Sequence, residues 1–133
     1  MNASEVAPIG VVLFGHGARN PLWAKPMEQI AQKMRADSGL CVSLAFLEFL
    51  QPGLQQACQE LARDFAIKKI LVIPVFLAGA GHLINDLPDL LQSVRLSLPD
   101  LIIEQKPPLG DRQEVIDALV LSFLQDAASA RLS

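Results

Sequence analysis

Three side chains that could handle a metal ion or a proton lie at or just beyond the ends of apolar segments. His16 lies in GHGAR, directly after the run VVLF, and His82 lies in GAGHLINDLP, directly after ILVIPVFLA. They are the two histidines of the chain, and Glu48 lies near the end of another apolar segment, CVSLAFLEF. Neutral imidazole binds Fe, Co, Ni, Cu and Zn, and two imidazoles with one carboxylate leave coordination positions open for an incoming ligand. The set indicates metal chemistry or acid–base chemistry, provided that the fold brings its members together.

Four apolar segments, each followed by a segment of helical periodicity, predict how these side chains are positioned. The segments are VVLF (11–14), CVSLAFLEF (41–49), KKILVIPVFL (68–77) and LIIEQ (101–105). Strands that alternate with helices, the first and third almost continuously apolar, are typical of a parallel sheet covered on both faces. We therefore expect an α/β fold, a doubly wound and mostly parallel four-stranded sheet with helices on both faces.

Each of the four predicted helices carries one apolar stripe that should face the sheet. The stripes are Trp23, Met27, Ile30 and Met34; Leu54, Ala57, Cys58, Leu61 and Phe65; Leu87, Leu90, Leu91, Val94 and Leu98; and Ile116, Leu119, Val120 and Phe123. Asn20 and Pro21 are typical of a helix start. Pro26 would clash with the carbonyl four residues earlier in a helix that ran regularly from Pro21, so the regular helix should begin near Lys25.

The predicted sheet brings the three chemical side chains to one edge. Ligands of open α/β sheets bind in the crevice outside the carboxyl ends of the strands. His16 follows the first strand, Glu48 lies at the end of the second, and His82 follows the third. The apolar residues around Glu48 in FLEFL (46–50) indicate partial burial, which raises the pKa of a carboxyl group and makes it a better acid or base.

Glycines beside both histidines permit sharp turns and a close approach of the backbone to a ligand. We take Gly15, Gly17 and Gly81 as candidate contacts to a bound molecule. Arg19 joins them, because its guanidinium and the backbone amides of the following helix start could bind an anionic group. Each residue also has a structural interpretation: a hydrogen-bonded or capping histidine, a solvated charge at Glu48, a surface charge at Arg19. Two histidines beside glycines at the same edge favour the functional interpretation.

Composition excludes several classes of protein. The 133 residues are 51% hydrophobic and 19% charged, which is enough to bury the core of a single domain. A net charge of −3 and 5% aromatic residues argue against a nucleic-acid partner. The apolar runs fall short of the roughly 20 residues that cross a bilayer, and MNASEVAPIG lacks the features of a signal peptide. We expect a cytoplasmic protein without membrane contact, in which Cys41 and Cys58 are reduced thiols of the core.

Several motifs occur in an order that resembles a known family. They are GHGAR after the first strand, FLE at the end of the second, P-x-F-L-x-x-x-G-H-x-x-x-D-L-P, and PPLG at 107–110. Together they resemble the short-form class II chelatases: the CbiX-like sirohydrochlorin cobaltochelatases and their siroheme ferrochelatase relatives. The resemblance spans about residues 10–125, and it departs from the family at Ala18, where Ser is usual, and at Asn85, where longer or basic residues are common.

The resemblance implies a function and a site. It implies one chelatase domain over 1–133, with an ordered core at about 10–125, that inserts a divalent metal into sirohydrochlorin or a related tetrapyrrole without ATP. The metal, Co²⁺ first and Fe²⁺ or Ni²⁺ next, is then a substrate of cobalamin or siroheme biosynthesis, and no organic cofactor is implied. His16 and His82 correspond to the family's metal-handling histidines, and Glu48 to a glutamate that binds metal or accepts a proton. Two identical chains would pair as a homodimer around the ring.

Other functions stay open at this point. A carrier of metal or tetrapyrrole would use the same cleft without turnover. A phosphate-ester or nucleotide enzyme would use the glycine turns as an anion cradle, but neither GxGxxG nor GxxxxGK[ST] occurs in the sequence. A purely structural partner module would leave the paired histidines without a role.

Overall fold

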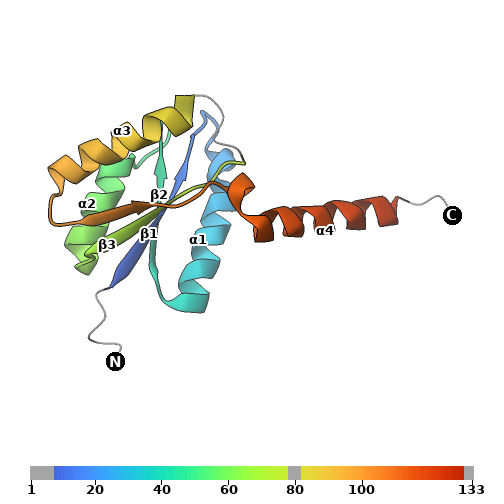
Figure 1. The fold of residues 1–133 in the computed structure, drawn as a ribbon. Coiled ribbons are helices and arrows are strands. Elements are labelled where there is room, and N and C mark those ends of the chain that lie inside the picture. The colour runs from blue at the N-terminus through green and yellow to red at the C-terminus, as the bar shows by residue number, and fades with distance from the viewer. Residues whose placement is uncertain (1–7, 78–81, 131–133) are drawn as a thin grey trace.

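The computed structural model describes residues 8–77 and 82–130, and the side chains of 82–85 lie outside the description. Four strands form one sheet in the order β2-β1-β3-β4 (Figure 1). They are β1 (Ile9–Gly15), β2 (Cys41–Phe46), β3 (Lys69–Pro74) and β4 (Ile102–Gln105). All three neighbouring pairs are parallel, which confirms the predicted arrangement of the sheet.

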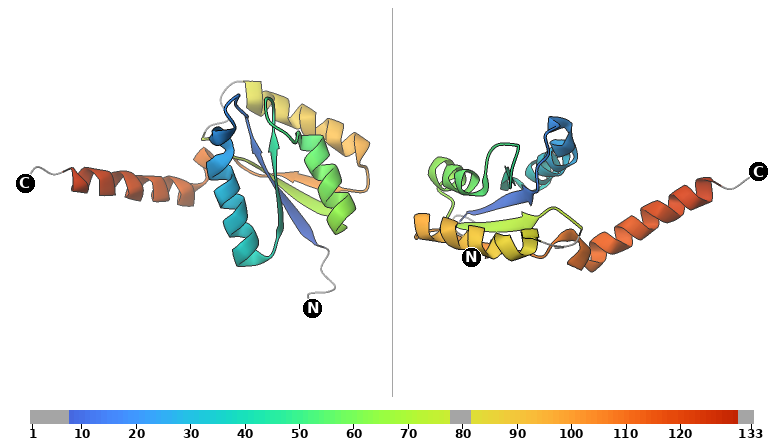
Figure 2. Two further views of the ribbon diagram at one scale, coloured as in Figure 1. Left: turned by 180° about the vertical axis from the view of Figure 1, so that it is seen from behind. Right: turned by 90° about the horizontal axis from the view of Figure 1, so that it is seen from above.

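Helices follow each strand and cover both faces, as predicted (Figure 2). They are the 3₁₀ turn η2 (Pro21–Ala24), α1 (Lys25–Ser38), α2 (Leu54–Phe65), α3 (His82–Ser97), the 3₁₀ turn η3 (Leu109–Asp111) and α4 (Gln113–Ser129). Buried residues of α1 pack with Val11 and Leu13 of β1 on one face of the sheet. Those of α2 and α3 pack with Val12 and Phe14 on the other. The central strand β1 is therefore buried on both sides, as its unbroken apolar run predicts.

The start of α1 follows from two prolines. The side chain of Asn20 accepts a hydrogen bond from the Leu22 amide at 3.0 Å and caps the short turn η2. The regular helix begins at Lys25, immediately before Pro26, which confirms the prediction. Trp23 therefore lies in η2 and is partly exposed, so its assignment to the apolar stripe of α1 was wrong.

The strands end earlier than the apolar runs predict. β2 ends at Phe46 rather than at residue 49, because the Phe46 amide donates to the carbonyl of Pro52 and the chain bends between them. β3 ends at Pro74 rather than at residue 77. Glu48 consequently lies in the bend after β2 and not within the strand. Apolar content alone does not separate a strand from the apolar loop that continues it.

Three helix stripes are less buried than predicted. In α1 and α2, Ile30 and Phe65 are exposed. The larger departure is α4, which buries no residue and extends away from the sheet (Figures 1 and 2). The expectation that its stripe faces the chain's own sheet was wrong. None of the helices in the described residues has the length and apolar character needed to cross a membrane.

Arginines satisfy carbonyl groups on both outer strands. The Arg35 guanidinium donates to the Val42 carbonyl of β2 from Nε at 3.0 Å and from Nη2 at 2.6 Å. Arg95 donates to the Ile103 carbonyl of β4 at 2.8 Å. A side chain that occupies the edge of a sheet discourages a further strand from adding there.

The two cysteines give a test of the core. Both are free; Cys58 is buried, and desolvation raises the pKa of its thiol to about 12, whereas Cys41 is partly exposed. The thiolate is the nucleophile, so at pH 8 only about one Cys58 in 10,000 is reactive. We expect iodoacetamide to modify Cys41 in the native protein and Cys58 only after unfolding, measured by mass spectrometry with Cys41→Ser as the control. Rapid labelling of Cys58 in native Cys41→Ser would contradict the assigned core.

Candidate functional site

His16 and Glu48 meet because the pairing of β1 with β2 continues beyond both strands. The parallel register brings Gly15 opposite Phe46. The Leu47 amide then donates to the Gly15 carbonyl at 3.0 Å, and the Glu48 amide donates to the His16 carbonyl at 3.2 Å. The two side chains lie side by side, with His16 Nε2 3.4 Å from Glu48 Oε1. The loops thus position an imidazole and a carboxylate at the predicted edge of the sheet.

Both side chains of this pair are accessible. The His16 side chain is 48% exposed and the Glu48 side chain 49%. The apolar residues around Glu48 predict that its side chain is partly buried. This prediction was wrong for the single chain, because Leu47 and Phe49 also face outward. An open imidazole–carboxylate pair is able to bind a cation or to exchange protons with a molecule that approaches from outside.

Gly17 is the residue that permits this approach. Its φ is +96°, a conformation that side chains rarely adopt. A Cβ at this position would overlap the carbonyl oxygen of Glu48. Gly17 therefore supports the pair by letting the two loops come together. Its predicted role as a contact to a bound molecule stays a prediction.

Arg19 lies against an aromatic ring beside the pair. Its guanidinium carbon is 5.4 Å from the ring centroid of Phe49, a cation–π arrangement. Phe49 is 57% exposed and has a φ of +68°. Strained backbone of this kind occurs most often at functional sites. In the sequence, Phe49 contributes only to the expected burial of Glu48. Its position next to a candidate catalytic carboxylate is the signal that could have indicated a role of its own.

The loop after β3 brings a third segment toward the same edge. The Val75 amide donates to the Phe14 carbonyl at 2.8 Å, which ties the end of β3 to the end of β1. The PPLG turn lies against this segment, because the Leu109 amide donates to the Phe76 carbonyl at 3.1 Å. α3 then begins at His82. The side chain of His82 and the whole of Gly81 lie outside the described residues.

Within the residues that the structure describes, no three His, Cys, Asp or Glu side chains gather closely enough to hold a metal ion. The described part of the predicted site is therefore the pair His16 and Glu48, with Arg19 beside it. The topology places the start of α3 after β3, the strand that neighbours β1. The third member of the set stays a prediction from the sequence.

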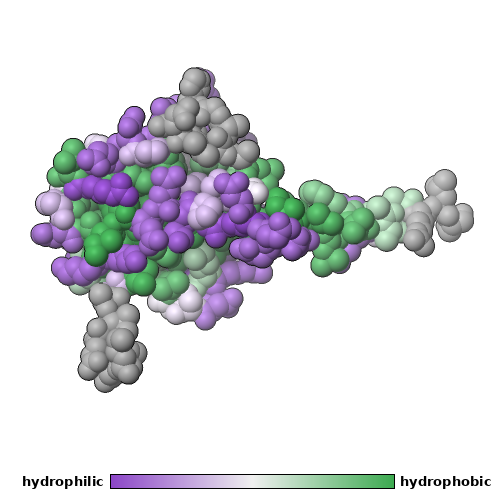
Figure 3. Space-filling view, in the orientation of Figure 1, coloured by the Kyte–Doolittle hydropathy of each residue, from purple (hydrophilic) through white to green (hydrophobic). Residues whose placement is uncertain are grey.

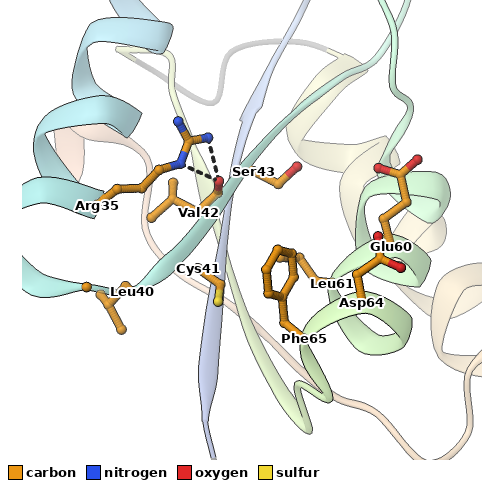
Figure 4. A pocket seen from close by; sticks show the side chains of 10 residues that line it. Arg35, Leu40, Cys41, Val42, Ser43, Glu60, Leu61, Asp64 and Phe65 are labelled. Carbon is orange, nitrogen blue, oxygen red and sulfur yellow. Dashed lines mark hydrogen bonds between the residues drawn. The ribbon is translucent and has the colours of Figure 1, made fainter.

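A separate groove lies at the other end of the sheet. It has a volume of about 340 Å³ and lies between α1 and α2, beside the amino end of the edge strand β2 (Figure 4). Arg35, Cys41, Glu60, Asp64 and Phe65 are among the residues that line it. The Arg35 guanidinium is already bonded to Val42 within this groove. It contains neither His16 nor Glu48, so it does not belong to the candidate site.

These observations define an α/β protein with an imidazole–carboxylate pair at the carboxyl edge of a four-stranded parallel sheet. The chain belongs to the CbiX family, whose model matches residues 10–125. The match covers the strands, the pair and most of α4.

Curated relatives from archaea are named sirohydrochlorin cobaltochelatases. The protein of Methanosarcina acetivorans is 31% identical over 127 residues, covering 90% of this chain and 96% of that protein. The protein of Methanocaldococcus jannaschii is 35% identical over 135 residues, covering 83% and 94%. The relative from Methanothermobacter thermautotrophicus is 36% identical over 90 residues, which is 68% of this chain and 62% of that protein. The match therefore spans about three fifths of the last relative and nearly all of the other two.

Solved structures show the same fold. A CbiX protein from Marinobacter aquaeolei VT8 superposes with a TM-score of 0.81 at 20% identity, covering 92% of this chain and all of that one. The sirohydrochlorin chelatase SirB from Bacillus subtilis subspecies spizizenii, in complex with cobalt, superposes with a TM-score of 0.74 at 21% identity. That match covers 89% of this chain and 50% of SirB, so this chain has the fold of half of the longer protein.

Gly17 provides a test of how the pair is built. We expect Gly17→Ala to lower the free energy of unfolding by about 2–3 kcal/mol, since it adds a steric overlap to the cost of positive φ. Gly39→Ala is the matched control, because Gly39 has a φ of +71° and open space around it; its cost should be about 1 kcal/mol. Urea denaturation measures both. Equal losses in the two variants would show that the close approach of the two loops does not constrain the fold.

Proposed function

We propose that this chain inserts a divalent metal ion, Co²⁺ first and Fe²⁺ next, into sirohydrochlorin or a related tetrapyrrole without ATP. The observation that carries the proposal is the His16–Glu48 pair, 3.4 Å apart at the carboxyl edge of the sheet in a chain of the CbiX family. The names of the archaeal relatives support cobalt as the first choice of metal. The metal is a substrate in this proposal and leaves with the product.

Imidazole ligation suits the delivery of such a metal. His16 and His82 are the proposed protein ligands, and a two-histidine set leaves positions open to water and to the nitrogens of the incoming ring. The exposure of His16 fits a ligand that must meet a large substrate at the surface. The protein's contribution is to hold the ion in place and remove part of its water shell.

Metallation releases two protons from the inner nitrogens of the ring, so a base is required. We assign the first of these two protons to Glu48, because a carboxylate beside the metal ligand can accept a proton as the ring nitrogen binds the ion; the second passes to the solvent to which the pair is open. Arg19 and the backbone amides near it are proposed to bind carboxylates at the ring periphery. Gly15, Gly17 and Gly81 are proposed to let the backbone approach the ring.

The size of the substrate supports a paired arrangement. We propose that residues 1–133 form one domain, with its core at about 10–125, and that two copies enclose the ring. The single chain corresponds to half of SirB in fold, which fits a lobe that needs a second lobe. A cytoplasmic location stays a prediction from the sequence.

An anaerobic absorbance assay tests the function. Purified protein, sirohydrochlorin and Co²⁺, Fe²⁺ or Ni²⁺ in turn should give metallated product faster than the same mixture without protein. We expect His16→Ala and His82→Ala each to lower the rate at least about tenfold, as loss of a metal ligand requires. Metallation at the rate without protein, with ring or metal still bound, would instead support a carrier.

The role of Glu48 is separable from that of the histidines. We expect Glu48→Gln to lower the metallation rate about 10²-fold, the usual contribution of a positioned base, while Co²⁺ affinity changes less than about threefold. Asp37→Asn also replaces a carboxylate by its amide, but in the exposed last turn of α1 at the amino end of the sheet, and should leave both quantities unchanged. Titration with Co²⁺ alone and the absorbance assay measure the two. A parallel loss of Co²⁺ affinity in Glu48→Gln would make Glu48 a ligand rather than the base.

A further inference from the structure

Phe49 is a large apolar side chain that the proposed chemistry does not use. It directly follows Glu48 of the candidate pair and is 57% exposed. Other large apolar side chains are exposed too, above all along α4, which Figure 3 shows as a largely hydrophobic arm. Phe49 differs from them in its backbone. Within the part of the chain that the structure describes, it is the one exposed large apolar residue with a positive φ.

The backbone at Phe49 forms a strained turn. Its φ is +68°, and the Leu50 amide donates to the Glu48 carbonyl at 2.8 Å across it. A hydrogen bond between residues two apart around a positive φ is the pattern of the rare, strained form of the γ-turn. The other non-glycine residue with positive φ in the described ranges is Ala66, which ends α2 as its C-cap. Phe49 ends no helix, so helix capping does not account for its conformation.

This turn sends two neighbouring apolar side chains in different directions. Leu50 is half-buried and packs with the core residues between the sheet and α1. Phe49 faces solvent beside Glu48. A glycine would adopt the same φ without strain. A phenylalanine at this position exposes an aromatic face on a strained backbone, and such strain occurs most often at functional sites.

The surroundings of Phe49 indicate what its exposed ring contacts. The Arg19 guanidinium carbon lies 5.4 Å from its ring centroid, and Leu47, on the other side of Glu48, is 37% exposed. An aromatic face with a cation beside it suits a conjugated ring that carries carboxylates at its rim. The face of such a ring stacks on Phe49 while a carboxylate at the rim reaches Arg19. A small anion alone would make no use of the aromatic face.

We propose that Phe49 binds the face of the tetrapyrrole by aromatic stacking and holds the ring beside the His16–Glu48 pair. Consecutive Cα atoms are about 3.8 Å apart, so a ring that stacks on Phe49 extends over the neighbouring carboxylate. The inference rests on the proposed function, since it names the residue that positions the substrate of that reaction. Stacking acts on the bound ring throughout the reaction, so Phe49 contributes to the affinity for the ring and not to the rate of the bound complex.

Titration of metal-free sirohydrochlorin into the protein, followed by the absorbance of the ring, tests the contact. We expect Phe49→Leu, which retains an apolar side chain but no aromatic face, to raise the dissociation constant about tenfold. Phe49→Tyr retains the face and should bind about as tightly as the wild type. Phe65→Leu removes an equally exposed phenylalanine from α2 and should also bind as the wild type does. Unchanged affinity in Phe49→Leu, or equal losses in both leucine variants, would overturn the proposal.

Two further measurements separate stacking from a structural role. Phe49→Gly removes the side chain and the backbone strain together, so it should lose ring affinity while its melting temperature stays within about 4 °C of the wild type. In protein with ¹³C-labelled phenylalanine, the Phe49 ring protons, assigned by comparison with Phe49→Leu, should shift upfield as sirohydrochlorin binds, because they lie over its conjugated face. Absence of this shift at saturation, or a larger loss of melting temperature in Phe49→Gly, would contradict the stacking role.

The outcomes also separate this inference from the proposed function. Wild-type protein that binds sirohydrochlorin through Phe49 but does not accelerate metallation would contradict the chelatase and support the stacking. Wild-type protein that accelerates metallation while Phe49→Leu binds the ring equally well would support the chelatase and contradict the stacking. Wild-type protein that binds no sirohydrochlorin would overturn both.

Discussion

The parallel pairing of β1 with β2 is the constraint on which the candidate site depends. Two backbone hydrogen bonds continue this pairing past the strands, from Leu47 to Gly15 and from Glu48 to His16. They place the His16 and Glu48 side chains within 3.4 Å of each other. The approach is close enough to require glycine at position 17. Strand register thus fixes the chemistry, since a shift of one residue would separate the two side chains.

The sheet owes its rigidity to burial of β1 on both faces. Val11, Val12, Leu13 and Phe14 are each at most 2% exposed. Residues that directly follow such a strand are held in place by it. The loops to which they belong are nevertheless open to solvent. A buried strand that ends in an exposed loop suits the proposed function, in which the site holds an ion and then passes it to a large ring.

The sequence predicts those parts of the fold that arise from periodicity. Unbroken apolar runs and helical stripes identify the strands and α1 to α3, and the two prolines locate the start of α1 at Lys25. The sequence is enough to predict that His16 and Glu48 lie at the same edge of the sheet, because the carboxyl ends of parallel strands lie together. The detailed geometry of the pair was not predictable. The end of β2 depends on the hydrogen bond between the Phe46 amide and the Pro52 carbonyl, and the exposure of Glu48 depends on the bend that follows β2.

The position of α4 shows a different limit of sequence reasoning. Its apolar stripe correctly indicates a helix, but periodicity contains no information about which surface the stripe packs on. The structure leaves both α4 and the β3–β4 half of one sheet face uncovered.

The proposed binding of one metal ion by His16 and His82 together can be measured directly, because these are the chain's two histidines. Long-range ¹H–¹⁵N correlation spectra of the imidazoles, recorded as Co²⁺ is added, would report on each ring by itself, with Zn²⁺ as the diamagnetic reference. If both histidines bind the ion, both sets of imidazole signals change together and saturate at one Co²⁺ per chain. Signals of either histidine that stay unchanged at saturation would contradict it.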